Sequence, residues 1–219
     1  MEQSHYFNQQ SQDPKYYFRI NGFIDKTSLS LSSAKWLFSA DYFDLGTRIL
    51  LKYLNFWQDG DKKVLDLGCG YGLVSVFIFS QVQERKYPTI KNLHIDACDI
   101  SPLAVDLTKH NLATFEQQNW LTYHVQHSDI LSDKYFSDKL YNTIILNPPF
   151  SAGKKAVKQM ITQAQAHLAA KWALRIVVPT KKGAKSYIDR CREEFGVTSI
   201  TIQSLEAGYR VWTVENLWE

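Results

Sequence analysis

A glycine-rich turn between a strand and a helix is the feature that most constrains the fold. Residues 62–67 (Lys-Lys-Val-Leu-Asp-Leu) have the composition of a short buried strand, and Gly68-Cys-Gly-Tyr-Gly72 follows directly. The apolar segment 73–83 then predicts a helix. Glycines let a backbone approach a ligand at positions where a Cβ atom would intervene. A strand, a tight turn and a helix in this order indicate the ligand-binding edge of an open α/β sheet.

The spacing of these glycines excludes two familiar phosphate-binding loops. A dinucleotide-binding Gly-x-Gly-x-x-Gly would need a glycine at position 73, which is Leu, and no Gly-Lys-Ser/Thr of a P-loop follows. The alternative to a ligand-binding turn is a purely structural one.

The alternation of strand-like and helix-like segments continues along the chain. Strands are predicted over 93–99, 121–126, 140–146 and 173–178, and helices over 101–115, 153–170 and 184–195. Residues 198–205 and 209–214 predict a closing antiparallel pair around Ala207-Gly208. The pattern predicts an α/β, Rossmann-like fold with a mostly parallel seven-stranded sheet and an antiparallel edge strand.

The segment before residue 60 does not follow this alternation. Residues 16–20 and 28–32 predict short strands, and residues 45–54 predict a helix. We expect a single domain over residues 1–219, in which 1–60 form a short N-terminal extension packed on the sheet and 61–219 form the core.

Composition excludes several classes of protein. The 219 residues are 45% hydrophobic and 14% aromatic, which is too apolar for a disordered chain. Three widely spaced cysteines give neither a disulfide framework nor a zinc or other metal site. The polar start lacks the apolar centre of a signal peptide, and no apolar run is long enough for a membrane span. We therefore expect a cytoplasmic protein, and the sequence does not decide between a monomer and a homodimer.

Positive charge gathers in the last third of the chain. Residues 151–219 hold 11 Lys and Arg against 6 Asp and Glu, whereas residues 1–150 hold 14 against 16. This distribution is compatible with a polyanionic partner, although an ordinary solvated face would give the same count. The lysines that follow two predicted strands at one sheet edge are candidates for phosphate contacts: Lys154, Lys155, Lys158, Lys181, Lys182 and Lys185.

Two acidic residues follow the next predicted strands. Asp99 ends the strand after the glycine turn, where a carboxylate accepts two hydrogen bonds from a ribose diol. Its alternative role is to cap the helix that begins after Ser101, and Asp96 is a rival that the strand's alternation disfavours. Asp129, in Ser128-Asp-Ile130, is placed to accept a hydrogen bond from an adenine amino group, although an exposed turn Asp is equally consistent.

The fourth motif, Asn147-Pro-Pro-Phe150, follows a buried-type strand. The two prolines stiffen the backbone and remove two amide donors. What remains is a pair of acceptors, the Asn147 amide oxygen and the Pro148 carbonyl, beside the flat ring of Phe150. This set suits a planar group that bears an NH2. A rigid loop without a ligand is the alternative.

Together these residues resemble a known family. Asp66-Leu-Gly-Cys-Gly-Tyr-Gly72, Asp99 and Asn147-Pro-Pro-Phe150 resemble the class I S-adenosylmethionine-dependent methyltransferases, in which this Asn-Pro-Pro variant marks methylation of exocyclic or amide nitrogens. Residues 38–51, 147–155 and 180–184 more narrowly resemble the small-subunit ribosomal RNA guanine-N2 methyltransferases of the RsmC type. The resemblance covers nearly the whole chain, but only the catalytic half of the longer, two-domain members.

The resemblance implies a methyl donor, a site and a partner. The donor is S-adenosyl-L-methionine, held by Asp66, Gly68, Gly70, Gly72, Asp99, Ile100, Asp129, Ile130 and Asn147. The catalytic residues are Asn147, Pro148, Pro149 and Phe150. The partner is RNA, either ribosomal RNA or the small ribosomal subunit, and the target base must be unpaired or flipped out.

Other substrates fit the same acceptors. An adenine N6 amino group or a protein glutamine amide also presents an NH2, and a non-catalytic module that retains the fold is a further alternative, which the intact Asn147-Pro-Pro-Phe150 disfavours. Aromatic residues near the N-terminus also fit stacking on bases, but core packing is the stronger expectation for Tyr16, Tyr17, Phe18 and Trp36.

Overall fold

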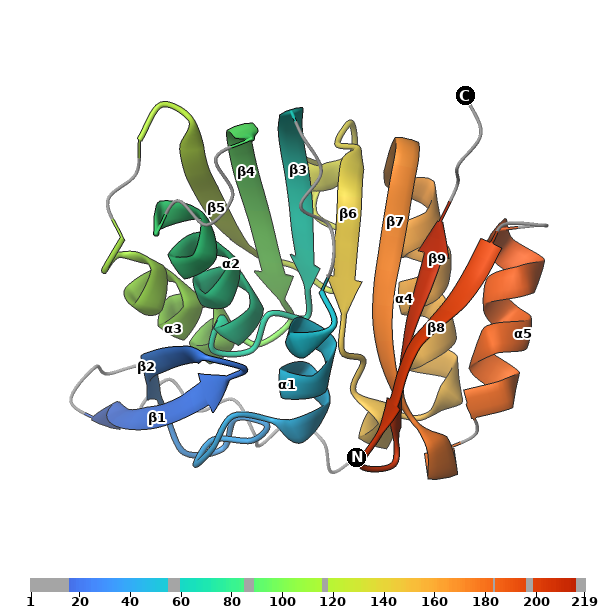
Figure 1. The fold of residues 1–219 in the computed structure, drawn as a ribbon, viewed down its shortest axis with the longest axis horizontal. Coiled ribbons are helices and arrows are strands. Elements are labelled where there is room, and N and C mark those ends of the chain that lie inside the picture. The colour runs from blue at the N-terminus through green and yellow to red at the C-terminus, as the bar shows by residue number, and fades with distance from the viewer. Residues whose placement is uncertain are drawn as a thin grey trace.

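A seven-stranded sheet covered by helices on both faces forms the centre of the protein (Figure 1). The computed structural model describes residues 16–54, 60–84, 89–115, 118–182, 184–195 and 199–215. The strand order is β5-β4-β3-β6-β7-β9-β8. The strands are β3 (Gly60–Leu67), β4 (Ile90–Asp99), β5 (Leu121–His127), β6 (Tyr141–Leu146), β7 (Leu168–Pro179), β8 (Ser199–Glu206) and β9 (Tyr209–Glu215). The predicted fold class is confirmed.

The antiparallel strand lies one place inside the edge. Strands β3 to β7 pair in parallel, β9 runs antiparallel to β7, and β8 pairs antiparallel with β9. The β8–β9 turn uses Ala207 and Gly208, both at positive φ. Two such residues match the right-handed twist of the strands that they join.

Alternate residues of the central strands supply two separate cores. In β3, Val64 packs in one cluster and Leu65 in the other. The first cluster includes α1 (Leu45–Lys52), α2 (Leu73–Gln83) and α3 (Pro102–Leu112), which lie in front of the sheet in Figure 1. The second includes α4 (Lys154–Ala166) and α5 (Ala184–Phe195), on the opposite face. A sheet buried on both faces explains the near-continuous apolar sequence of its central strands.

The N-terminal segment is a hairpin followed by α1. Strands β1 (Phe18–Ile24) and β2 (Thr27–Ser33) pair only with each other. Asn111 of α3 fixes the hairpin, because its amide accepts from Ser32 N at 2.7 Å and donates to Ser32 O at 2.9 Å and to Tyr71 O at 2.8 Å. The predicted strands and helix of this segment are present, and the division into residues 1–60 and 61–219 stays a prediction.

One predicted helix is too long. Helix α4 ends at Ala166, and β7 already begins at Leu168, inside the range 153–170 predicted as helix. Tyr141 N donates to His167 O at 2.8 Å, and Tyr141 pairs with Leu168 in the sheet. Pairing with β6 therefore overrides the helix propensity of Leu168-Ala-Ala.

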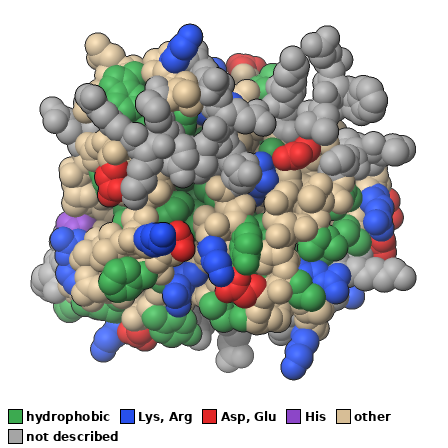
Figure 2. All heavy atoms as spheres, in the orientation of Figure 1, with side chains coloured by type: hydrophobic (Ala, Val, Ile, Leu, Met, Phe, Trp, Pro, Cys, Tyr) green, Lys and Arg blue, Asp and Glu red, His purple; other side chains and the backbone are tan. Residues whose placement is uncertain are grey.

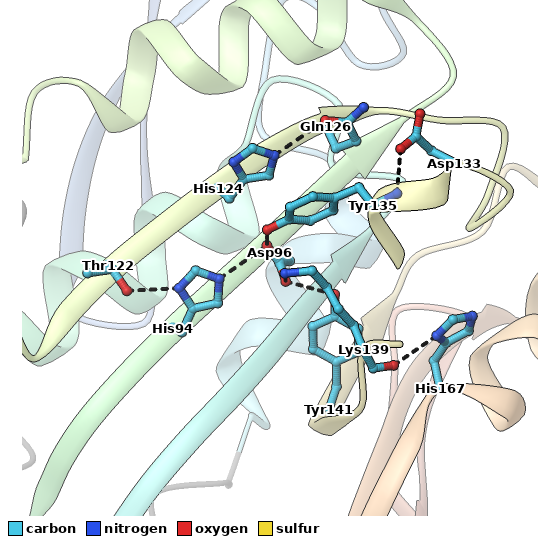
Figure 3. Close-up of polar contacts among 10 residues, drawn as sticks. All are labelled: His94, Asp96, Thr122, His124, Gln126, Asp133, Tyr135, Lys139, Tyr141 and His167. Atoms are coloured by element: carbon cyan, nitrogen blue, oxygen red, sulfur yellow. Dashed lines mark hydrogen bonds and ion pairs between the residues drawn. The ribbon is translucent and has the colours of Figure 1, made fainter. Parts of the chain in front are cut away.

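Asp96 lies within the polar network of Figure 3, and its partner Tyr141 belongs to the core cluster that contains α4 and α5. Its carboxylate accepts hydrogen bonds from Tyr135 Oη at 2.6 Å, Tyr141 Oη at 2.8 Å and His94 Nε2 at 3.2 Å. Lys139 Nζ lies 3.4 Å from the same carboxylate. Burial raises the pKa of Asp96, but the hydrogen bonds and the neighbouring His94 outweigh burial and bring it to about 2. Its acceptors are committed to this network, which explains why Asp96 is not a ligand-binding rival of Asp99.

Replacing Asp96 by Asn should destabilise the fold by about 2–3 kcal/mol, because two tyrosine hydroxyls and Lys139 lose an anionic acceptor. A carboxylate whose pKa falls on folding stabilises the protein above its ordinary pKa, and this contribution is lost as the pH falls from about 4 towards 2. Urea denaturation at neutral and acidic pH measures both effects. The Asp96→Asn protein should show a shallower loss of stability over this range, whereas the exposed Asp138→Asn control should match the wild type; equal stability of all three at neutral pH would contradict the role.

Candidate functional site

A cavity of about 560 Å³ opens at the carboxyl ends of β3, β4 and β6. A volume of this size is typical of small-molecule sites. The loop before α1 and the start of α4 complete its wall. The predicted site residues that line it are Asp66, Gly68, Gly70, Asp99, Ile100, Asp129, Ile130, Asn147, Pro148 and Pro149. Gly72 and Phe150 lie outside the lining.

The glycine loop is tied to the end of β4. Gly68 N and Cys69 N both donate to Cys98 O, at 2.9 and 3.0 Å. Gly68, Gly70 and Gly72 have φ values of +79°, +57° and +85°, in the region that favours glycine. A Cβ on Gly70 would meet no atom within 4 Å, so this position faces open space. Gly70 thus lets a ligand approach the backbone.

Gly72 serves the packing of two helices. It precedes α2, and a Cβ there would lie 3.0 Å from the side chain of Thr108 and 3.2 Å from its Cα. Thr108 Oγ1 in turn donates to Gly70 O at 2.9 Å. The third glycine therefore lets α2 and α3 approach, and it shapes the cavity only through the loop.

Asp66 is a buried carboxyl at the end of β3. Its Oδ2 accepts from Ser75 Oγ at 2.7 Å and from Ser75 N at 3.2 Å. Burial raises the pKa of Asp66 to about 7, against the lowering effect of the Ser75 hydrogen bonds. The charge of this group near neutral pH therefore responds to any cation that enters the cavity.

Asp99 supports the loop and also lines the cavity. Its Oδ2 accepts from Gly70 N at 3.0 Å, and its Oδ1 accepts from Ser101 N at 2.9 Å. Ser101 caps α3, as predicted, by accepting from Ala104 N. Burial raises the pKa of Asp99, and the backbone donors oppose that rise. The carboxylate thus has the predicted location, and its contact with a ribose stays a prediction.

The loop that follows β5 contains a strained residue, Ile130. Ile130 has a φ of +54°, a conformation that β-branched residues rarely adopt. The thiol of Cys98 donates a hydrogen bond to Ile130 O, at an Sγ–O distance of 3.4 Å. Ile130 is half-buried, whereas Asp129 beside it is exposed, and both line the cavity. A strained residue of this kind costs about 1–3 kcal/mol and is typical of functional sites.

Two residues of the N-terminal segment fix the amide of Asn147. Its Nδ2 donates to Asp44 Oδ2 at 2.7 Å and to Thr47 Oγ1 at 2.8 Å. A carboxylate only accepts hydrogen bonds, so the nitrogen of the amide must face Asp44. Both amide hydrogens are then used, and Oδ1 remains as an acceptor beside the cavity.

Asp44 and Thr47 were absent from the predicted site. Asp44 is the N-cap of α1 and accepts from Thr47 N at 2.7 Å. An Asp directly before a predicted helix is a recognisable cap signal. Nothing in the sequence, however, shows that this cap would meet a residue about a hundred positions later.

The remainder of the Asn-Pro-Pro-Phe motif is divided between the cavity and the core. Pro148 is buried, Pro149 is exposed, and Pro149 O accepts from Ala152 N at 2.9 Å. The half-buried Phe150 ring packs edge-on against Tyr187 of α5, with ring centroids 5.4 Å apart. Its predicted stacking on a substrate therefore stays a prediction.

The aromatic and basic candidates for RNA contacts are divided between the core and the surface. Tyr17 and Phe18 pack against the core, as expected, but Trp36 is 70% exposed, so core packing was the wrong expectation for it. Tyr16 is also exposed. Lys154, Lys155, Lys158 and Lys181 are exposed, and the side chains of Lys182 and Lys185 lie outside the described residues. The coloured part of the face in Figure 2 mixes Lys and Arg with Asp and Glu.

The described residues offer neither a cluster of metal ligands nor a membrane-spanning helix. No group of three or more His, Cys, Asp or Glu side chains in these ranges could hold a metal ion. None of the described helices is both long and apolar enough to cross a membrane.

A family model describes most of the chain. Residues 28–212 match the methyltransferase small domain. This chain belongs to the methyltransferase small domain family. The matched range begins within the N-terminal segment and covers nearly all of strand β2, helix α1 and residues 44–47 of this chain. The prediction of a methyltransferase is confirmed.

Relatives within this family differ in length. The uncharacterized protein YbxB of Bacillus subtilis is 28% identical over 90% of this chain and 91% of its own length. Ribosomal RNA small subunit methyltransferase C of Haemophilus influenzae is 32% identical over 86% of this chain, but this region is only 52% of that protein. The chain thus spans nearly the whole length of YbxB but only about half the length of ribosomal RNA small subunit methyltransferase C.

Solved structures show the same fold. The T. thermophilus 16S rRNA N2 G1207 methyltransferase (RsmC), in complex with AdoMet and guanosine, matches with a TM-score of 0.74 at 20% identity. The match covers 92% of this chain and 51% of that one.

The two glycines should respond differently to substitution. Gly70→Ala should cost about 1–2 kcal/mol, because only the left-handed backbone is penalised. Gly72→Ala should cost about 1–3 kcal/mol more, because the added Cβ also overpacks against Thr108. Urea denaturation of both variants measures the difference, and equal destabilisation would contradict the packing role of Gly72.

Proposed function

We propose that this protein transfers the methyl group of S-adenosylmethionine to the N2 amino group of a guanine in small-subunit ribosomal RNA. The observation that carries the proposal is the orientation of Asn147. Its two amide hydrogens are held by Asp44 and Thr47, so Oδ1 is left to accept a hydrogen bond at the cavity. An acceptor fixed in this way selects a group that donates, such as an NH2.

The residues of the cavity fit S-adenosylmethionine. Gly68 and Gly70 offer backbone without a Cβ, and three carboxyl groups lie at successive strand ends. Asp66 suits the ammonium group of the methionine part, Asp99 the ribose diol and Asp129 the adenine amino group. When bound, S-adenosylmethionine supplies an electrophilic methyl group on a sulfonium centre. Ile100 and Ile130 would flank the adenosine with apolar surface, since both line the same cavity.

The chain's own groups prepare the nucleophile. A guanine amino nitrogen is a poor nucleophile, because its lone pair is delocalised into the ring. Asn147 Oδ1 and Pro148 O would accept its two hydrogens and favour a pyramidal nitrogen with its lone pair directed outward. The rigid Pro148-Pro149 backbone holds these acceptors in place before the substrate arrives. The contribution is orientation and electrostatic preorganisation, and the proton leaves after methyl transfer.

Guanine in ribosomal RNA is favoured by the relatives. Those named ribosomal RNA small subunit methyltransferase C share up to 34% identity with this chain, and the T. thermophilus structure contains guanosine. Exposed lysines on the first turns of α4, beside the cavity, agree with an RNA partner. Action in the cytoplasm follows from this substrate.

The test of the substrate is methyl transfer from radiolabelled S-adenosylmethionine into small ribosomal subunits, naked ribosomal RNA, transfer RNA and cell protein. Mass spectrometry then identifies the labelled nucleoside or residue. The proposal expects N2-methylguanosine in small-subunit RNA. Label in N6-methyladenosine or in a glutamine amide would retain the fold and the donor and overturn the substrate.

Asn147→Ala should reduce turnover by at least about 100-fold, because a preorganised hydrogen-bonding group is lost. The affinity for S-adenosylmethionine, measured by calorimetry, should fall far less than turnover, because Asn147 is only one of the residues predicted to hold the donor. Asn142→Ala is the matched control, since Asn142 lies at the other end of β6, where its Oδ1 accepts from Lys63 N. Wild-type turnover in the Asn147→Ala protein would remove Asn147 from the mechanism.

Thr47→Val should lower kcat by about 10-fold, because removing the hydroxyl leaves one of the two hydrogens that orient Asn147 without its acceptor. KM should move little, whereas the free energy of unfolding should fall by about 1–3 kcal/mol, because the hydroxyl's hydrogen bonds with Asp44 and Asn147 are lost. Thr47→Ser keeps the hydroxyl and should restore kcat. A Thr47→Ser protein as slow as Thr47→Val would indicate a packing role instead.

A further inference from the structure

The loop between β2 and α1 presents three aromatic side chains to solvent. Trp36 is 70% exposed, Phe38 73% and Tyr42 65%. Rings of this size normally contribute to the core, and an exposed group of them marks an interaction site. Trp36 and Phe38 also line the cavity that contains Asn147. Two of the three rings, Trp36 and Phe38, are therefore continuous with the proposed active site, and Tyr42 follows on the same loop.

The backbone of this loop is fastened in place. Tyr42 O accepts from Ser39 Oγ at 3.1 Å and from Tyr71 Oη at 3.2 Å. Tyr71 belongs to the glycine loop and is buried. Trp36 and Ser39 have φ values of +74° and +54°, which non-glycine residues seldom adopt. The backbone of the loop is therefore locally strained but held in one conformation, with the rings exposed. A surface that is already ordered loses less entropy when a partner binds.

Three exposed lysines lie on α4, a helix that lines the same cavity. Lys154, Lys155 and Lys158 are exposed on the first turns of α4, whose Ala156 and Gln159 line the same cavity. Aromatic rings beside lysines are the combination by which proteins bind single-stranded nucleic acid, with bases stacked and phosphates neutralised. An apolar protein partner would gain nothing from the lysines.

We propose that Trp36, Phe38 and Tyr42 form a stacking surface for the unpaired nucleotides that flank the target base. The proposal rests on the proposed RNA substrate. A base that leaves its helix to reach Asn147 also unstacks its neighbours, and aromatic rings at the cavity mouth replace the lost stacking. The lysines of α4 neutralise the phosphates of the same strand.

The test compares RNA binding by four proteins: the wild type, Trp36→Ala/Phe38→Ala, Trp36→Phe and Phe23→Ala. Phe23 is the matched control, because it is 62% exposed on β1 but does not line the cavity. Fluorescence anisotropy with a labelled single-stranded oligoribonucleotide, in the presence of S-adenosylmethionine, gives the Kd. The double variant should weaken binding by about 5- to 100-fold. Trp36→Phe retains a π face and should retain most of the affinity, and Phe23→Ala should match the wild type.

Three further measurements on the same samples separate the alternatives. Calorimetry with S-adenosylmethionine alone should give equal affinities, and a selective loss in the double variant would assign the rings to the donor and overturn the proposal. Size-exclusion chromatography that shows loss of a dimer only in the double variant would assign them to a contact between copies. A methylation assay tests the substrate itself. If the wild type methylates RNA but all four proteins bind RNA equally, the stacking surface alone fails; if the wild type methylates no RNA, the proposed function fails too.

Discussion

The hydrogen bonds that join Asn147 to Asp44 and Thr47 connect the central sheet to the N-terminal segment. Asn147 follows β6 in the centre of the sheet, whereas Asp44 and Thr47 begin α1 in the N-terminal segment. A free Asn side chain would present either end of its amide to the cavity. Of the two ends of this amide, the carboxylate of Asp44 accepts only from the nitrogen, so Asn147 turns its oxygen to the cavity. The orientation of this amide at the sheet edge therefore depends on the N-cap residue of α1. The same carboxylate stabilises α1 by accepting from Thr47 N, which couples local folding to the site.

The sheet edge is shaped by contacts that serve folding and binding together. Asp99 uses one oxygen for Gly70 N and the other for Ser101 N, so it holds the glycine loop while it lines the cavity. Thr108 leaves no room for a side chain at Gly72, and its hydroxyl donates a hydrogen bond to Gly70 O. Burial raises the pKa values of Asp66 and Asp99. These carboxyl groups are therefore costly to ionise when no cationic partner is bound. A positively charged ligand offsets that cost directly.

Much of this site could be predicted because its residues follow strands. Parallel strands place their carboxyl ends at one edge, so Asp66, Asp99 and Asn147 had to meet there once the alternation of the chain was recognised. Contacts outside the sheet were less accessible. The partner of Asn147 lies 103 residues away, and helix propensity could not reveal that Leu168 pairs with Tyr141. The residue type of Trp36 favoured a place in the core. In the structure it is exposed, in a loop where Trp36 and Ser39 adopt positive φ.

The N-terminal segment therefore cannot be treated as an appendage to a complete catalytic core. Asn111 joins β2 to the glycine loop, Tyr71 joins that loop to Tyr42, and Asp44 orients Asn147. Two of these contacts reach Tyr71 of the glycine loop and the third reaches Asn147, so displacement of the segment would disturb the glycine loop and the Asn147 acceptor at once. A site assembled in this way gains rigidity from long-range contacts, and the position of the N-terminal segment becomes part of the geometry on which the proposed methyl transfer would depend.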